Sequence, residues 1–362
     1  VLVSIVICGA LYYPVFFGDA FAVNKSDGMN LALTRCAFFA RYFSRSIFPF
    51  WNNVCNLGHG IVDGSSFPLH PLNSLMIVWS PLAAHSIFII GMLAVLFFSS
   101  IVYFYRISCG VWGVLVGCLT YCLCGPIFFH HSYWSDILFL IGLPLTFIRI
   151  HLFDKKKTLK NGILLYAVLL TVIYTVNHEL ALYYFAVIAV ERVAFFWSKG
   201  KDAFAEMRLW IILLAGALLS GAFYFVPFSE WFIHSSRTNL QYGNNFFPHP
   251  LNLVSALLMA ETITRHTYPA YYFYIGIVPI LLACVGFFWE KNVYLRRLYT
   301  VSLFFLLRYI IAYICTVLNC SFLPGADHFR GITVFMFFMA IMSARGCAII
   351  LSFIQAKKNI LL

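Results

Sequence analysis

Apolar residues run along the chain in stretches of about 20, separated by shorter polar segments. A helix of that length crosses a hydrocarbon layer of roughly 30 Å. The pattern predicts about ten transmembrane helices, at residues 1–17, 80–105, 109–129, 135–153, 161–177, 180–198, 209–229, 271–289, 298–319 and 331–353. Barrel strands would alternate apolar and polar residues over about ten positions, and no such alternation is seen. We expect an all-α polytopic membrane protein.

The pattern predicts one transmembrane domain over residues 1–362, with two long loops at 18–79 and 230–270. The first long loop contains "MNLALTRCAFFARYFSR" (29–45), which places apolar residues on one helical face and three arginines on another. This arrangement is typical of a helix that lies in the headgroup plane. We therefore expect interfacial helices in this loop. Residues 1–17 end in "YYPVFF", which lacks the small-residue pattern of a cleaved signal peptide and favours a span.

The composition supports a membrane protein and sets its predicted orientation. Hydrophobic residues make up 62% of the chain and charged residues 10%, against roughly 45–50% and 25% in soluble domains. Most lysines and arginines fall in the short loops on one side, near 106, 149–160, 192–208, 291–297 and 357–358. The positive-inside rule then makes both termini cytoplasmic. The net charge of +11 reflects this topology and, because the cations share no single face, it does not indicate nucleic acid.

Acidic and histidine side chains gather at the predicted outer helix ends. Such groups near a bilayer usually face a protein interior or a wet cavity, because exposure to lipid is costly. They are also the usual proton-transfer groups. We expect one outer cavity that contains Asp19, Asp63, His130, His131, Asp136, His178, Glu179 and His328. The alternative is that these residues are polar only because loops are polar.

The histidine and cysteine spacings do not predict a metal site. "FFHHSYWSD" (128–136) brings imidazole and carboxylate together at one helix entrance, which leaves a divalent metal open as a cofactor. Adjacent histidines point to different faces, however, and no HxxxH spacing is present. "NHE" (177–179) is a predicted hairpin between two helices, in which Asn177 caps a helix or, alternatively, His178 and Glu179 face the cavity. The eleven cysteines lack zinc spacing and lie mostly in spans, where we interpret them as small apolar residues.

Several segments, in order along nearly the whole chain, resemble the bacterial YfhO family of the GT-C class of glycosyltransferases. The likeness begins with "GD" after the first span and continues through "FPFWNNVCNLGHG" and "SYWSDILFLIGLPLTFIRI". It extends through "YTVNHELALYYFAVIAVERV", "LLSGAFYFVPFSEWFIHSSR" and "YYFYIGIVPILLACVGF" to "DHFRGITVFMFFMAIMSARG". The ordered set carries the resemblance, since no single segment is diagnostic.

The resemblance implies a multi-pass protein of the bacterial cytoplasmic membrane that moves a sugar from a polyprenyl-phosphate lipid to an extracytoplasmic acceptor, such as a cell-envelope glycan. GT-C enzymes carry an acidic residue just after the first helix, and Asp19 stands there as the implied general base. Partial desolvation at the lipid boundary would raise the pKa of such a carboxylate toward that of a useful base. Arg237, Arg265 and Arg330 are candidates to hold the donor phosphate. Asp19 could instead mark a plain helix terminus.

Two departures keep other functions open. YfhO proteins are usually longer, and an aromatic residue more often follows the hairpin asparagine, where this chain has His178 and Glu179. The chain could therefore be a short relative, a fragment, or a non-catalytic subunit or scaffold that binds protein partners in an envelope complex. A lipid or polysaccharide transporter is a third reading. Transporters usually show internal repeats and mid-membrane charges. Here the charges expected within the membrane, Arg308 and Arg345, are few, and no repeat is visible.

Overall fold

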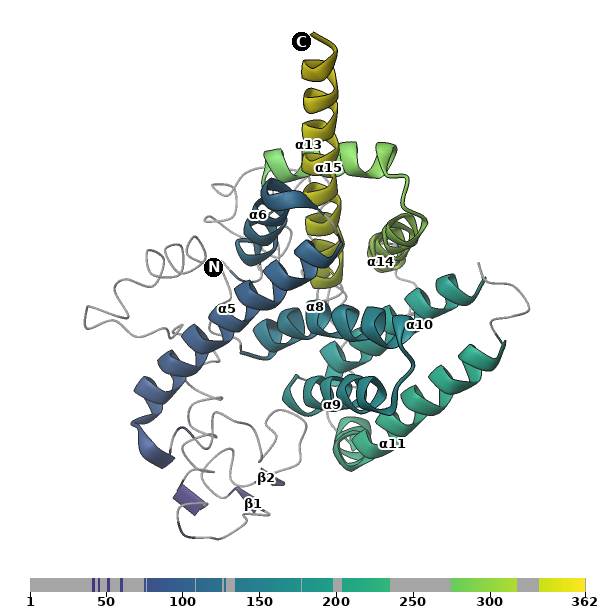
Figure 1. Ribbon diagram of the computed structural model, residues 1–362. Helices are drawn as coiled ribbons and strands as arrows, with labels where there is room; N and C mark the ends of the chain where they lie inside the picture. The colour runs from purple at the N-terminus through teal and green to yellow at the C-terminus, as the bar shows by residue number, and fades with distance from the viewer. Residues whose placement is uncertain are drawn as a thin grey trace.

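The computed structural model is almost entirely helical (Figure 1). It describes residues 41–42, 45, 51–52, 59–60, 75, 77–107, 109–125, 127, 134–176, 178–197, 204–234, 275–317 and 332–361. Within these ranges lie the long helices α5 (Pro81–Arg106), α6 (Gly110–Cys122), α8 (Trp134–Lys155), α9 (Leu159–Thr175), α10 (His178–Trp197), α11 (Phe204–His234), α13 (Ile277–Trp289), α14 (Val293–Val317) and α15 (Ile332–Leu361). Each overlaps one predicted span, and the predicted span at 1–17 lies outside the described residues.

Three segments of these helices are long and apolar enough to cross a membrane: Ser86–Arg106, Ile137–Lys155 and Thr333–Lys357. Gly110–Cys122, Leu159–Thr175 and Ile277–Trp289 are apolar but shorter. The described part of the chain therefore supports a membrane protein with several apolar helices. It does not extend to all ten predicted spans.

Two helices are shorter than the sequence pattern predicts. Helices α6 and α13 each have 13 residues, which is about 20 Å of helix. Helix α6 ends at Cys122, and a turn at Leu123 and a bend at Cys124 interrupt the helical backbone. Helix α13 begins after Gly276, whose φ of 89° is in the region that favours glycine. Apolar periodicity continues across both breaks and so overestimates the helix lengths.

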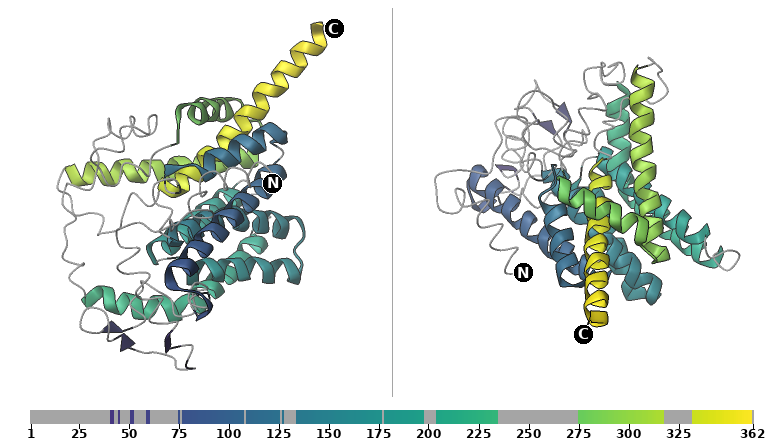
Figure 2. Two further views of the ribbon diagram at one scale, coloured as in Figure 1. Left: turned by 90° about the vertical axis from the view of Figure 1, so that its left-hand side faces the viewer. Right: turned by 90° about the horizontal axis from the view of Figure 1, so that it is seen from above.

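Helix α15 is the centre of one half of the molecule. Figures 1 and 2 show α13 crossing it at a steep angle, and α6 and α14 also pack on it. The backbones meet closely: a Cβ added to Gly346 would lie 1.8 Å from the Leu282 carbonyl oxygen, and one on Gly286 would lie 2.2 Å from the Met342 oxygen. On the α6 side, a Cβ at Gly113 would lie 2.6 Å from the Ala344 oxygen. Small residues at helix crossings allow this approach in membranes.

Helix α8 is the centre of the other half and packs against α5, α9 and α10. Pro144 lies inside it and cannot donate a hydrogen bond to the Leu140 carbonyl. The Tyr121 hydroxyl on α6 donates to that carbonyl at 2.7 Å instead. Phe147 of α8 stacks on Phe337 of α15 with centroids 5.6 Å apart, so aromatic side chains join the two halves.

The first long loop contributes two short strands to the described residues, β1 (Trp51–Asn52) and β2 (His59–Gly60). They pair antiparallel, with Trp51 opposite Gly60 and Asn52 opposite His59. The hydrophobic pattern did not predict this pairing. Of the interfacial helix predicted at 29–45, only Arg41 and Tyr42 are described as helical, together with a turn at Arg45, so most of that prediction lies outside the described residues.

Candidate functional site

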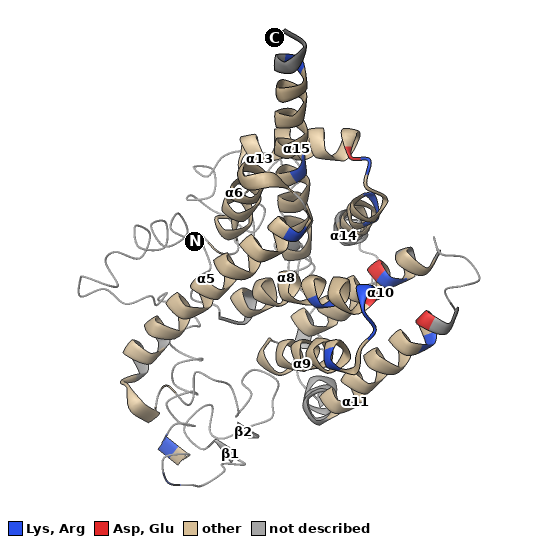
Figure 3. Ribbon diagram, in the orientation of Figure 1, with Lys and Arg blue, Asp and Glu red and all other residues tan. Residues whose placement is uncertain are grey.

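The charged side chains of the long helices gather toward the ends joined by short turns (Figure 3). The most buried group combines Asp154 at the end of α8 with Glu191 and Arg192 near the end of α10. The Arg192 guanidinium donates to both Glu191 carboxylate oxygens, from Nε at 2.5 Å and from Nη2 at 2.6 Å. Its Nη1 donates to Asp154 Oδ2 at 2.7 Å. We call these three residues the buried triad.

Aromatic side chains cover the cation of the triad. The Arg192 Cζ atom lies 4.5 Å from the ring centroid of Phe195 and 4.6 Å from that of Trp210 on α11. Stacking of this kind suits the planar guanidinium, which is more weakly hydrated than an ammonium. Burial raises the pKa of the Tyr294 phenol at the start of α14, and the Glu191 carboxylate nearby raises it further. The triad therefore brings together α8, α10, α11 and α14.

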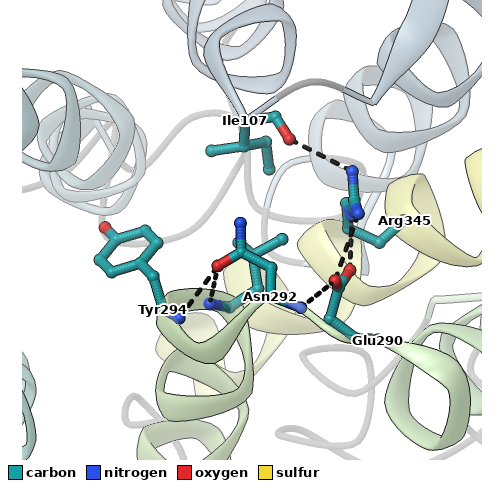
Figure 4. Close-up of polar contacts among 6 residues, drawn as sticks. Ile107, Glu290, Asn292, Tyr294 and Arg345 are labelled. Carbon is teal, nitrogen blue, oxygen red and sulfur yellow. Dashed lines mark hydrogen bonds and ion pairs between the residues drawn. The ribbon is translucent and has the colours of Figure 1, made fainter. Parts of the chain in front are cut away.

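A second ion pair holds a different set of turns (Figure 4). Arg345 of α15 donates to the Glu290 carboxylate, from Nε at 2.5 Å and from Nη2 at 3.2 Å. Its Nη1 donates to the Ile107 carbonyl after α5 at 3.4 Å. The Asn292 backbone N–H donates to Glu290 Oε1 at 2.7 Å, while the Asn292 side chain caps α14 by accepting from Tyr294 N at 2.9 Å. This clasp joins α15 to the α5–α6 and α13–α14 turns.

The α8–α9 turn is built by local hydrogen bonds. Thr158 caps α9 by accepting from the Asn161 N–H, and the Asn161 side chain donates to the Leu152 and Lys156 carbonyls. Lys157 in the turn forms an ion pair of 2.5 Å with Glu206 of α11. Both side chains of this pair are partly exposed, so it contributes less than about 1 kcal/mol.

The geometry of the ion pairs indicates a structural role. The triad carries two carboxylates and one guanidinium, hence a formal charge of −1 when all are ionised. Within the described residues Asp154 Oδ1 is buried without a hydrogen-bond partner, as is the Trp210 Nε1. No three His, Cys, Asp or Glu side chains among the described residues are placed to hold a metal ion. The remaining carboxylate oxygens are engaged by arginine, which suits them to holding helices together.

The predicted site residues lie mostly beyond what the structure describes. Asp136, His178 and Glu179 fall in the first turns of α8 and α10, but their side chains are outside the described set. The others lie outside the described residues altogether: Asp19, Asp63, His130, His131, Arg237, Arg265, His328 and Arg330. The predicted convergence of these groups on one cavity stays a prediction.

Sequence reasoning missed the triad. It counted Arg192 among the cations that mark the cytoplasmic side, whereas its side chain is only 3% exposed. The available signal was the acid–base pair "ER" inside an apolar helix, since membrane helices rarely carry charges that are not paired internally. Arg345 was identified as a buried charge, and its partner Glu290 was not. The cysteines described on α6 and its flanks, Cys109, Cys118, Cys122 and Cys124, are buried, which suits small apolar residues, whereas Cys284 of α13 is exposed.

Comparison with known proteins gives no relative from which a function could be transferred. No protein-family model matches the chain, and no curated protein or solved structure is similar to it. The resemblance to the YfhO family therefore stands on the sequence segments alone.

Proposed function

We propose that the chain is a GT-C-type membrane glycosyltransferase that transfers a sugar from a polyprenyl-phosphate donor to an extracytoplasmic acceptor. The ordered resemblance to the YfhO family is the reason for naming this class. The proposal includes the full set of ten spans, the bacterial cytoplasmic membrane, and cytoplasmic termini. Asp19 acts as the general base, and Arg237, Arg265 and Arg330 hold the donor phosphate.

One observation supports a site away from the short turns. The described ion pairs occupy the ends joined at 107–109, 156–158 and 290–292, where arginines pair with the buried carboxylates. Helices α8 and α10 begin at their other ends, with Asp136, His178 and Glu179 in their first turns. Because the short-turn ends are closed by structural pairs, acid–base chemistry is expected at the opposite ends, next to the long loops.

Sugar transfer from a polyprenyl-phosphate donor, normalised to folded protein, tests the proposal. Asp19→Asn keeps the side-chain size but removes the proton acceptor, so the rate should fall by about 10²–10⁴-fold. Asp27→Asn is the matched control, because it removes a carboxylate from the same loop at a position with no proposed role. Equal activities in wild type and Asp19→Asn would remove Asp19 from the mechanism. Absence of transfer from all three proteins would favour a non-catalytic subunit.

A further inference from the structure

We infer that the short-turn ends of α8, α9, α11 and α14 form a docking surface for anionic phospholipid headgroups. The surface consists of five exposed cations, called here the basic rim: Lys155, Lys156, Lys160, Arg208 and Arg296. Figure 3 shows basic residues at the short-turn ends of α8, α9, α11 and α14. The inference concerns lipid contact alone and does not depend on the proposed glycosyl transfer.

The charge balance of the described residues carries the inference. Four acidic side chains are described, and each is already in an ion pair: Asp154, Glu191, Glu206 and Glu290. Their partners in these ion pairs are Arg192, Lys157 and Arg345. The basic-rim side chains make no ion pair with any described residue, and the formal charge of −1 on the triad offsets only part of their positive charge, so the described side chains of this surface carry a net positive charge. An anionic partner would therefore complement the basic rim.

Exposed apolar side chains beside the cations favour lipid over other anionic partners. Leu159 is 81% exposed next to Lys160, and Ile163 is exposed one turn further along α9. Trp289 and Val293 are exposed on either side of the α13–α14 turn, close in sequence to Arg296. A mixed belt of aromatic, aliphatic and basic side chains is typical of the membrane–water interface. A nucleic acid would gain nothing from the aliphatic side chains.

The test compares lipid retention by the full chain in neutral detergent micelles with equal amounts of phosphatidylglycerol and phosphatidylcholine. Native mass spectrometry gives the ratio of the two lipids bound. Wild type should prefer phosphatidylglycerol, and Lys155→Gln/Lys156→Gln/Lys160→Gln should reduce that preference by up to about fivefold for each charge removed. Raising the salt concentration should reduce the wild-type preference as well, because the cations are exposed. Lys157 stays unchanged because it is paired with Glu206.

The matched control replaces the same three lysines by arginine, which retains the charge and should retain the preference. Thermal unfolding of each protein verifies that folding is intact, and Lys156→Gln alone serves if the triple variant is unstable. An unchanged preference in the folded glutamine variant, or no preference in wild type, contradicts the inference. Displacement of phosphatidylglycerol by a single-stranded oligonucleotide at lower concentration would also overturn it, in favour of nucleic acid.

Discussion

The helices that pack around α15 and the helices that pack around α8 are held in contact by different interactions. Around α15, backbones approach so closely that Gly346 and Gly286 leave no room for a methyl group. Around the C-terminal ends of α8 and α10, the helices are held through long side chains, with Arg192 reaching Asp154 across the interface. Tolerance to substitution around α15 should therefore depend on side-chain volume, and tolerance around the ends of α8 and α10 should depend on charge.

This difference predicts different responses to substitution. Close backbone contact in a membrane depends on van der Waals packing between small residues, so added volume is harmful. A buried ion pair gains little over an apolar replacement of both partners, yet removal of one partner leaves an uncompensated charge.

The largest effect is expected at the triad. Arg192→Met leaves Glu191 and Asp154 without their cation and should destabilise the fold by about 3–5 kcal/mol. The combined replacement Asp154→Leu/Glu191→Met/Arg192→Met should recover most of that loss. Chemical unfolding in detergent micelles measures both. If the combined variant is as unstable as the single one, charge does not explain the loss.

At the α13–α15 crossing, the added side-chain volume should determine how much a substitution destabilises the protein. Gly346→Ala places a Cβ 1.8 Å from the Leu282 carbonyl oxygen and should cost about 1–3 kcal/mol or more, because a backbone must shift. Gly91→Ala on α5 is the matched control, since a Cβ there meets nothing within 4 Å. Helix propensity alone should stabilise that variant by up to about 1 kcal/mol. Similar melting temperatures for the two alanine variants would disprove the tight crossing.

The clasp should tolerate the loss of its arginine better than the triad does. Arg345→Met leaves one buried carboxylate, Glu290, which still accepts a hydrogen bond from the Asn292 backbone N–H, whereas Arg192→Met leaves two carboxylates without their cation. Arg345→Met should therefore cost about 1.5–3 kcal/mol. The same unfolding measurement compares it with Arg192→Met. The order of the two losses is the informative result, and the reverse order would show that the number of carboxylates left without a cation does not set the cost.

The smallest expected effect is at the proline of α8. Tyr121→Phe removes the donor to the Leu140 carbonyl and should cost about 1 kcal/mol. Tyr299→Phe is the control, because within the described residues that buried hydroxyl has no hydrogen-bond partner. Its removal should be neutral or slightly stabilising. Equal losses in the two variants would mean that the Leu140 carbonyl finds another donor.

The apolar pattern predicted where helices occur better than how long they are. Each long helix that the structure describes overlaps a predicted span, because about 20 apolar residues favour a helix whatever surrounds them. The ends of α6 and α13 differed, because the turn at Leu123 and the positive φ of Gly276 are features of backbone geometry that hydropathy does not report. Of the outer candidate site, the first turns of α8 and α10 are described only in their backbone, so its predicted convergence is still to be tested.

Composition and spacing by themselves indicated a helical protein whose apolar helices suggest a membrane protein, with many of its cations close in sequence to the short segments between helices. Both properties depend on residues close together in the sequence. The tertiary structure decided which charges are partners: Asp154 meets Arg192 over 38 positions and Glu290 meets Arg345 over 55. It also decided that Gly286 and Gly346 touch. Pairing across helices depends on crossing geometry, which follows from packing of the whole chain and leaves no local mark in the sequence.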